Sequence, residues 1–129
     1  MVRVLVVDDD ARVREVFLEI LRGAGHEVQS ATDGAEGLRV FTEWQPDIVL
    51  VDMFMPVMDG LELIRALRGL STSVGIVAMS GVWQRSGVMD QALALGATQA
   101  LLKPVGIDVL LQTIDAVGRK SREPDEPAG

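Results

Sequence analysis

Short runs of apolar residues alternate along this chain with segments in which apolar residues recur every three or four positions. The runs are rich in β-branched residues, as expected for strands of a sheet that is covered on both faces. They predict five strands, at Val2–Val7, Glu27–Ala31, Ile48–Val51, Val74–Met79 and Ala100–Leu102. The Glu27–Ala31 run indicates a strand near an edge of the sheet.

The segments between these runs predict five helices. The first has Val13, Val16, Phe17, Ile20 and Leu21 at helical spacing and is expected to end at Gly23 or Gly25. Thr32 or Asp33 is expected to cap the second helix, which carries Leu38, Val40 and Phe41. The third contains Leu61, Leu63, Ile64 and Leu67.

The fourth helix is the least regular of the five. Val82–Leu95 is helical on balance, but Gly87 inside it costs about 1 kcal/mol relative to alanine, so we expect a loose helix. The fifth is predicted at Ile107–Val117, with Leu110, Ile114 and Val117 on one face.

Five strands alternating with five helices predict an α/β fold, in which a parallel sheet is covered on both faces. The chain of 129 residues has the size of one domain. We place this domain at residues 1–119. Residues 120–129 are expected to form a polar tail or the stub of a linker, since Ser121–Gly129 is polar and contains two prolines.

Composition excludes several classes of protein. The chain has no cysteine, which excludes disulfides and thiolate metal sites, and His26 is its single histidine. A net charge of −7 argues against direct nucleic-acid binding by this chain. No apolar run approaches the roughly 18 residues of a membrane span, and Val2–Val7 is too short for the core of a signal peptide. We therefore expect a cytoplasmic protein with no membrane contact.

Carboxylates follow two of the most apolar strands. Asp8, Asp9 and Asp10 come after the first strand, and Asp52 comes directly after the third. Ligands of open parallel sheets bind at the carboxyl ends of the strands, so these acids converge if the two strands are neighbours. Two carboxylates 4 Å apart repel by about 4 kcal/mol at an effective dielectric of 20, and a hard divalent cation such as Mg²⁺ relieves this repulsion.

The structural alternative is that such acids are helix N-caps. An acid after a strand often has only this role, and Asp10 is interpreted as a cap or as a solvated residue. Two further strand ends favour a functional site. The fourth strand ends at Ser80 and the fifth at Lys103, which would bring a hydroxyl group and a cation to the same edge.

Taken together, these segments resemble the receiver domains of two-component response regulators over roughly residues 2–119. The matching segments are Val6-Val7-Asp8-Asp9, Asp47-Ile48-Val49-Leu50-Val51-Asp52, Met55-Pro56-Val57-Met58-Asp59-Gly60, Ser80-Gly81 and Lys103-Pro104. The resemblance implies a flavodoxin-like fold with strand order 2-1-3-4-5. It also implies a cis peptide bond between Lys103 and Pro104.

The resemblance also implies a role for each residue of the site. Asp52 corresponds to the phosphoacceptor, Ser80 to the switch hydroxyl and Lys103 to the ion-pair partner of the phosphoryl group. Mg²⁺ would be held by Asp9 directly, by Asp8 mainly through water, by Asp52, and by the backbone carbonyl of Phe54. Such a domain catalyses its own phosphorylation and slow dephosphorylation and is otherwise no enzyme.

Partners are implied in the same way. The phosphoryl donor would be a histidine kinase, docking near Val13 and Phe17, or a histidine phosphotransfer protein. The signal would pass to an output domain or protein, from a monomer or from a homodimer that forms on phosphorylation.

Three positions depart from the family pattern. Ala100 stands where the family usually has an aromatic switch residue, so the signal would pass through the backbone of residues 81–83, or conventional switching would be lost. Phe54 and Val82 are apolar where the family tunes dephosphorylation. Because neither side chain can orient an attacking water, we expect a slowly hydrolysing aspartyl phosphate.

Three other functions are weighed against this interpretation. A receiver-shaped adaptor that is never phosphorylated would tolerate Ala100 but has no need of Asp9, Asp52, Ser80 and Lys103. A Mg²⁺-dependent phosphohydrolase could use the Asp8-Asp9-Asp10 spacing, yet the short chain has no room for a cap segment. A flavin-binding module would need a loop rich in serine and threonine after the first strand, and this loop is acidic.

Overall fold

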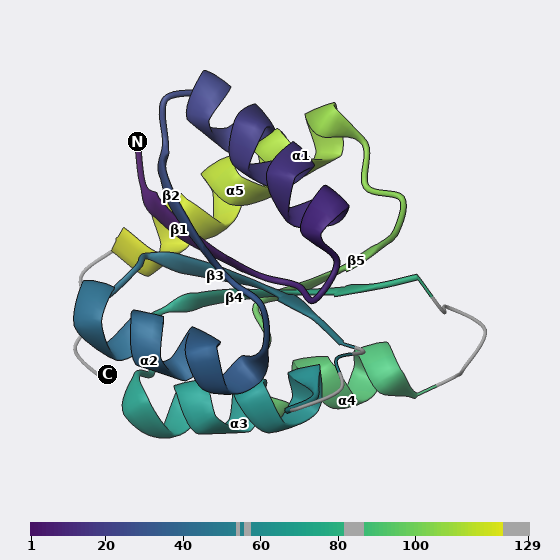
Figure 1. Cartoon of the computed structure of the whole chain (residues 1–129). Coiled ribbons are helices and arrows are strands. Elements are labelled where there is room, and N and C mark those ends of the chain that lie inside the picture. Colours follow the sequence, from purple (N-terminus) through teal and green to yellow (C-terminus); the bar gives the residue numbers. More distant parts are fainter. Residues whose placement is uncertain (54, 56–57, 82–86, 123–129) are drawn as a thin grey trace.

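The computed structural model describes residues 1–53, 55, 58–81 and 87–122. Strands and helices alternate throughout these residues (Figure 1). In chain order the elements are β1 (Arg3–Val7), α1 (Ala11–Gly23), β2 (Glu27–Ala31), α2 (Gly34–Trp44), β3 (Ile48–Asp52), α3 (Gly60–Leu70), β4 (Gly75–Ser80), α4 (Val88–Leu95), β5 (Gln99–Leu102) and α5 (Ile107–Arg122). Each strand begins and ends within one residue of its predicted bounds.

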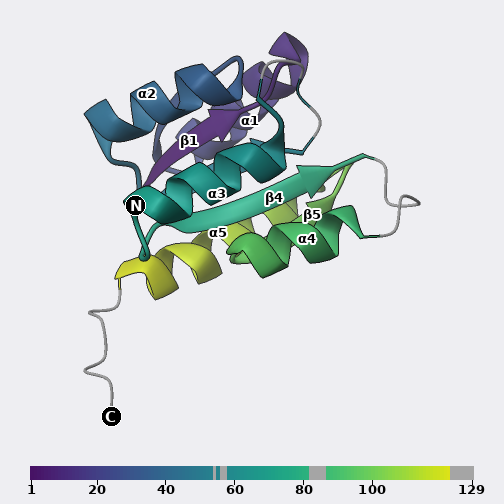
Figure 2. The ribbon, with the colours of Figure 1, turned by 90° about the horizontal axis from the view of Figure 1, so that it is seen from below.

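The five strands form one parallel sheet in the order β2-β1-β3-β4-β5. This confirms the order that the family resemblance implied. Helices α1 and α5 cover one face, and α2, α3 and α4 cover the other, so the molecule has three layers (Figures 1 and 2). The reversal of strand order lies between β1 and β3, where Val7 pairs with Val51.

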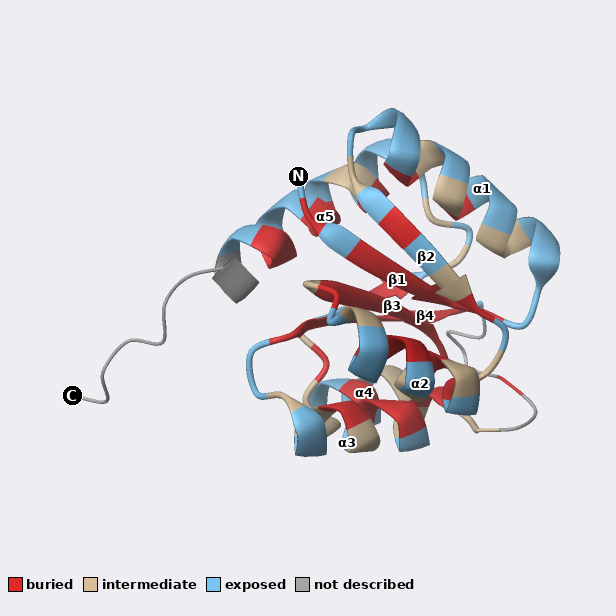
Figure 3. Cartoon of the chain, turned by 60° about the vertical axis from the view of Figure 1, so that its left-hand side comes forward, coloured by how far each residue is buried: buried red, intermediate tan, exposed pale blue. Residues whose placement is uncertain are grey.

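Two cores fill the spaces between the layers because successive side chains of a strand point to opposite faces. Leu5 and Val7 of β1 pack towards α2 and α3, whereas Val4 and Val6 pack towards α1 and α5. The central strands are buried along their whole length, as the red ribbons of Figure 3 show. This double burial explains why β3 and β4 carry no polar side chain before their last residues, Asp52 and Ser80.

Three helices begin at an aspartate whose side chain accepts a hydrogen bond from a first-turn backbone N–H. Asp10 caps α1, Asp33 caps α2 and Asp59 caps α3. The first two caps confirm predictions from the sequence, and of the two candidates for α2 it is Asp33 rather than Thr32. Such caps are worth about 1 kcal/mol each.

The structure corrects three details of the predicted helices. The fourth helix begins at Val88, and Gly87, expected inside it, instead precedes it with φ +105°; residues 82–86 of that prediction lie outside the described residues. Val16 is 52% exposed rather than part of the core, because the buried stripe of α1 runs through Phe17 and Leu21. The last helix continues to Arg122, beyond the predicted end at Val117.

No helix within the described ranges combines the length and the apolar character that crossing a bilayer requires. The division into a domain of residues 1–119 and a tail of residues 120–129 stays a prediction.

Candidate functional site

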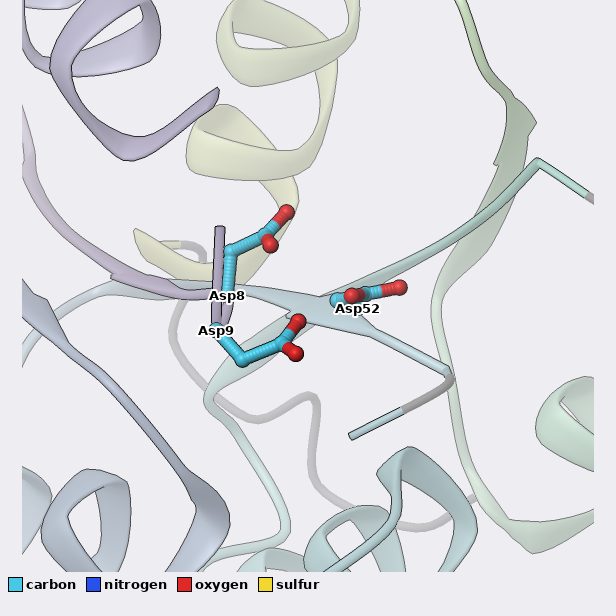
Figure 4. Close-up of side chains that lie close together, drawn as sticks. All are labelled: Asp8, Asp9 and Asp52. Carbon is cyan, nitrogen blue, oxygen red and sulfur yellow. The ribbon is translucent and has the colours of Figure 1, made fainter. Parts of the chain in front are cut away.

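Three carboxylates meet at the carboxyl edge of the sheet. Asp8 and Asp9 follow β1, and Asp52 is the last residue of β3. Because β1 and β3 are hydrogen-bonded neighbours, these acids emerge side by side. One oxygen of each of the three lies within 4.8 Å of the others, and Figure 4 shows all three side chains turned towards a common space. The convergence that the sequence predicted is therefore present.

Asp8 is the most tightly held member of the cluster. It is fully buried, and its Oδ1 accepts a hydrogen bond of 2.9 Å from the backbone N–H of Asp10. Its carbonyl oxygen accepts a second one of 2.7 Å from Nη1 of Arg14. Its own N–H donates to the carbonyl of Ala31 in β2. Hydrogen bonds to β2 and to the start of α1 thus fix the position of Asp8.

Lys103 supplies the cation of the site. Its Nζ lies 2.9 Å from Oδ2 of Asp8 and 3.6 Å from Oδ1 of Asp52. Burial lowers the pKa of Lys103, but the hydrogen bond to Asp8 and the charges of Asp52 and Asp8 outweigh it, so the pKa is raised above its ordinary value. Lys103 is therefore charged at neutral pH. The Lys103–Pro104 peptide bond is cis, as the resemblance implied.

Ser80 ends β4 on the far side of Asp52. It is fully buried, and it lies one position beyond Met79, the residue that pairs with Asp52. The backbone N–H of Lys103 donates to the carbonyl of Ser80 at 2.8 Å, which ties the ends of β4 and β5 together. The structure thus brings Ser80 to the same edge; the switching role of its hydroxyl stays a prediction.

The donor set suits a small hard cation. Three carboxylates face one lysine, so negative charge is in excess, and Asp52 is only 6% exposed while Asp9 is open to solvent. Mg²⁺ prefers carboxylate oxygens and keeps several water ligands, which an exposed flank permits. A sulfur- or nitrogen-seeking metal finds no matching ligand in this cluster.

Comparison with known proteins identifies the family. The family model described as "Response regulator receiver domain" matches residues 4–115. The chain belongs to this family. It is a receiver domain of the two-component response regulators, and its acidic cluster is of the kind at which receiver domains bind Mg²⁺.

Curated relatives of this chain include mycobacterial regulators. The chain is 41% identical over 120 residues to the transcriptional regulatory protein PrrA of Mycobacterium tuberculosis strain H37Rv, covering 92% of this chain and 50% of that protein. It is 36% identical over 126 residues to the response regulator MprA of M. tuberculosis strain H37Ra, covering 96% of this chain and 54% of that protein. The receiver domain thus spans about half the length of these relatives.

Solved structures confirm the fold. The chemotaxis protein CheY4 of Vibrio cholerae superposes with a TM-score of 0.85 at 34% identity, covering 91% of this chain and 98% of that one. A response regulator receiver domain protein of Clostridium thermocellum gives 0.89 at 27% identity, covering 95% and 98%.

Some expected features of the receiver domain lie outside the described residues. These are the Phe54 carbonyl, the Val82 side chain and the backbone of residues 82 and 83. Ala100 is described: it is half-buried, pairs with Ala78 and packs on the core beneath α4. A methyl group thus occupies the place where an aromatic ring was expected, and how this domain reads out its state stays a prediction.

Arg14 is a site residue that the sequence reasoning missed. Cations near a helix N-terminus oppose the helix dipole, yet α1 carries Arg12 and Arg14 close to its start and has no acid in its first turn. The position of these arginines, two and four residues after the last of three aspartates, is the signal that could have revealed the contact of Arg14 with Asp8.

Proposed function

We propose that Asp52 accepts a phosphoryl group in a site that holds Mg²⁺. Asp8, Asp9 and Asp52 would bind the ion, with the backbone carbonyl of Phe54 as a further ligand. The observation that carries the proposal is the meeting of three carboxylates within 4.8 Å, with the Lys103 ammonium 3.6 Å from Asp52. Neither a structural ion pair nor a helix cap needs that arrangement.

The reaction is a transfer to a carboxylate nucleophile. A carboxylate oxygen of Asp52 forms a bond to phosphorus as the bond between phosphorus and the donor atom breaks. The leaving group keeps the electron pair of the broken bond. Where it needs a proton, it takes one from solvent or from the protein that donated the phosphoryl group. When bound, Mg²⁺ neutralises charge on the phosphoryl oxygens. A carboxylate nucleophile uses its own lone pair, so this reaction needs no separate base.

Lys103 supports this reaction as a mobile counter-ion. The new phosphoryl group on Asp52 attracts its ammonium, which at rest is closer to Asp8 than to Asp52. Because the backbone N–H of Lys103 donates a hydrogen bond to the carbonyl of Ser80, a shift of Lys103 also affects the end of β4. A serine hydroxyl at that point can follow the phosphoryl oxygens, and the connection from β4 to α4 follows in turn.

The partners follow from the same chemistry. The phosphoryl group comes from a histidine kinase or a histidine phosphotransfer protein in the cytoplasm, and the domain itself turns over no other substrate. Relatives described as transcriptional regulators support an output domain that acts on transcription. The receiver acts as a monomer or as a homodimer formed on phosphorylation. The comparisons favour neither an adaptor nor a phosphohydrolase.

The test is the mass of the intact protein after incubation with acetyl phosphate and Mg²⁺. The wild type is expected to gain one phosphoryl group, and Asp52→Asn none. Asp33→Asn is the matched control, because Asp33 also follows a strand at this edge and asparagine preserves its capping role. It should be labelled like the wild type. An unlabelled wild type, or an equally labelled Asp52→Asn protein, would overturn the proposal.

A further inference from the structure

Arg68 of α3 binds only neutral acceptors among the described residues. Its Nε donates to the carbonyl of Gly96 at 2.8 Å, and its Nη1 to the carbonyls of Val74 at 2.6 Å and Ser71 at 3.3 Å. Its Nη2 lies 3.4 Å from Oγ1 of Thr98. The ion pairs found within the described ranges do not include it.

The acceptors of Arg68 explain how a half-buried cation is stabilised without a carboxylate. Ser71 is the C-cap of α3, and Gly96 is the C-cap of α4. Carbonyl groups at a helix C-terminus lack partners within the helix and carry partial negative charge. One guanidinium therefore neutralises the ends of two helices at once. Burial lowers its pKa, yet arginine remains charged at neutral pH.

The backbone at Gly96 packs closely against the side chain of Arg68. Gly96 has a φ of +121°, and a Cβ at that position would lie 2.6 Å from Cγ of Arg68. Two residues further on, Oγ1 of Thr98 also accepts a hydrogen bond from the N–H of Ile76 in β4. The C-terminal end of α4 is thus tied to α3 and, through Thr98, to the sheet.

The N-terminal end of α4 is built differently. Its N-cap is Gly87, which has no side chain to bind the first-turn N–H groups, whereas aspartates cap α1, α2 and α3. Figure 2 shows that α4 runs antiparallel to β4, so this end, which no side chain caps among the described residues, lies near the carboxyl edge, where β4 ends at Ser80. The tightly held end lies at the opposite edge.

We infer that Arg68 anchors the C-terminal end of α4, so that the helix moves about this end when the site at the carboxyl edge changes state. Arg68 is thus a positioning residue that acts through Gly96 and touches no reacting group. Only the trigger for the movement rests on the proposed function; the anchor is a property of the domain at rest.

Amide hydrogen exchange followed by mass spectrometry tests the anchor without any phosphoryl donor. In the wild-type chain, amides of Val88–Gln91 should exchange faster than those of Leu95–Thr98. Arg68→Met should raise exchange at Leu95–Thr98 by about tenfold or more, with a much smaller change in β1 and β3. Arg65→Met is the matched control, since Arg65 is an exposed arginine on the same helix, and it should change neither segment.

Arg68→Lys keeps the charge but loses the planar fork, and it replaces Arg68→Met if that protein does not fold. It should raise exchange at Leu95–Thr98 above that of the wild type, and by less than Arg68→Met where both variants fold. An equal rise in every segment would show that Arg68 contributes only general stability and would overturn the inference. So would an unchanged Leu95–Thr98 segment.

A second arm adds acetyl phosphate and Mg²⁺ to protein whose labelling on Asp52 is verified by mass. Phosphorylation of the wild type should change the exchange rate at Val88–Gln91 and leave that at Leu95–Thr98 the same. In Arg68→Lys, phosphorylation should change the exchange rate of both segments. An equal change along the whole of wild-type α4 contradicts the anchor. Absence of labelling contradicts the proposed function instead, and the first arm still decides on the anchor.

Discussion

Lys103 is shared unequally between two buried carboxylates. It contacts Asp8 at 2.9 Å and Asp52 at 3.6 Å, and its own side chain is 22% exposed. Asp8 gains most from this arrangement, because it is fully buried and its second oxygen is already bonded to the N–H of Asp10. In the unphosphorylated domain, Lys103 therefore offsets part of the negative charge of Asp8 and Asp52.

Replacing Lys103 by methionine should lower the free energy of unfolding by about 2–3 kcal/mol, because a buried carboxylate then loses its counter-ion. Added Mg²⁺ should recover part of the loss, since it neutralises the same acids. Urea unfolding with and without Mg²⁺ measures both effects. Arg39→Met, which breaks a surface pair with Glu43, is the control and should cost less than about 0.5 kcal/mol. Similar losses in both variants would refute this account of the site.

His26 is the single histidine and lies directly before β2, at the edge of the sheet opposite the site. Its Nδ1 accepts a hydrogen bond of 3.2 Å from the N–H of Val2, which requires an unprotonated nitrogen. Burial and the charge of the N-terminus lower the pKa of His26, and Asp115 opposes them only in part. The fold therefore favours neutral His26.

A lowered pKa fixes the sign of the pH dependence. The contribution of His26 to stability is fully present above its ordinary pKa of about 6.5 and is lost as the pH falls through its lowered pKa in the folded state. His26→Gln cannot be protonated, so its unfolding free energy should fall less than that of the wild type between about pH 7.5 and pH 5. Parallel urea titrations would show this. A steeper fall in the variant would contradict the assignment.

The residues at the site differ in how far the sequence predicted them. The sequence predicted the three carboxylates because an acid that directly follows an apolar strand lies at the carboxyl edge of the sheet. These acids are Asp8, Asp9 and Asp52. Arg14 at the site, and Arg68 at the opposite edge of the sheet, were not predictable, since each donates hydrogen bonds to backbone carbonyls whose position only the folded chain defines.

Among the elements, helix starts were predictable where a side chain makes them. Asp10 and Asp33 form caps with residues two or three positions away, so the signal is local. The start of α4 was placed wrongly because Gly87 acts through a positive φ, which spacing of apolar residues does not encode. A helix whose N-cap residue is glycine, beside helices capped by aspartate side chains, is the physical basis of the asymmetry argued for α4.

The cap of α2 offers a direct test at this scale. Asp33→Ala removes the side-chain acceptor for the N–H of Glu36 and should lower the free energy of unfolding by about 1 kcal/mol. Asp33→Asn preserves the acceptor and should cost much less. Chemical denaturation of both variants distinguishes lost capping from lost charge: equal losses would assign the effect to the charge.

For the whole molecule, the double burial of β1, β3 and β4 made a parallel sheet between two layers of helices predictable. The strand order was not derivable from the residues, because it depends on which long-range pairs form; it came from the family resemblance and proved correct. The same strand order determines where the site forms, since the carboxylates converge only because β1 lies beside β3.

The lifetime of the phosphorylated domain is a property of the whole site. Phe54 and Val82, which lie outside the described residues, offer no polar group to orient an attacking water, so the aspartyl phosphate should decay slowly. Phe54→Asn should shorten its half-life by roughly tenfold or more. Mass spectrometry of the phosphoprotein over time gives both rates. A wild-type half-life of seconds would contradict the prediction.

The most direct test of the central claim is to locate the phosphoryl group chemically. Borohydride reduces an acyl phosphate of aspartate to homoserine, so reduction after treatment with acetyl phosphate and Mg²⁺, followed by peptide sequencing in the mass spectrometer, marks the acceptor in the unaltered chain. Our account predicts homoserine at position 52 alone, and no homoserine when Mg²⁺ is removed by a chelator. Homoserine in place of Asp8 or Asp9, or full modification of Asp52 without the metal, would contradict it.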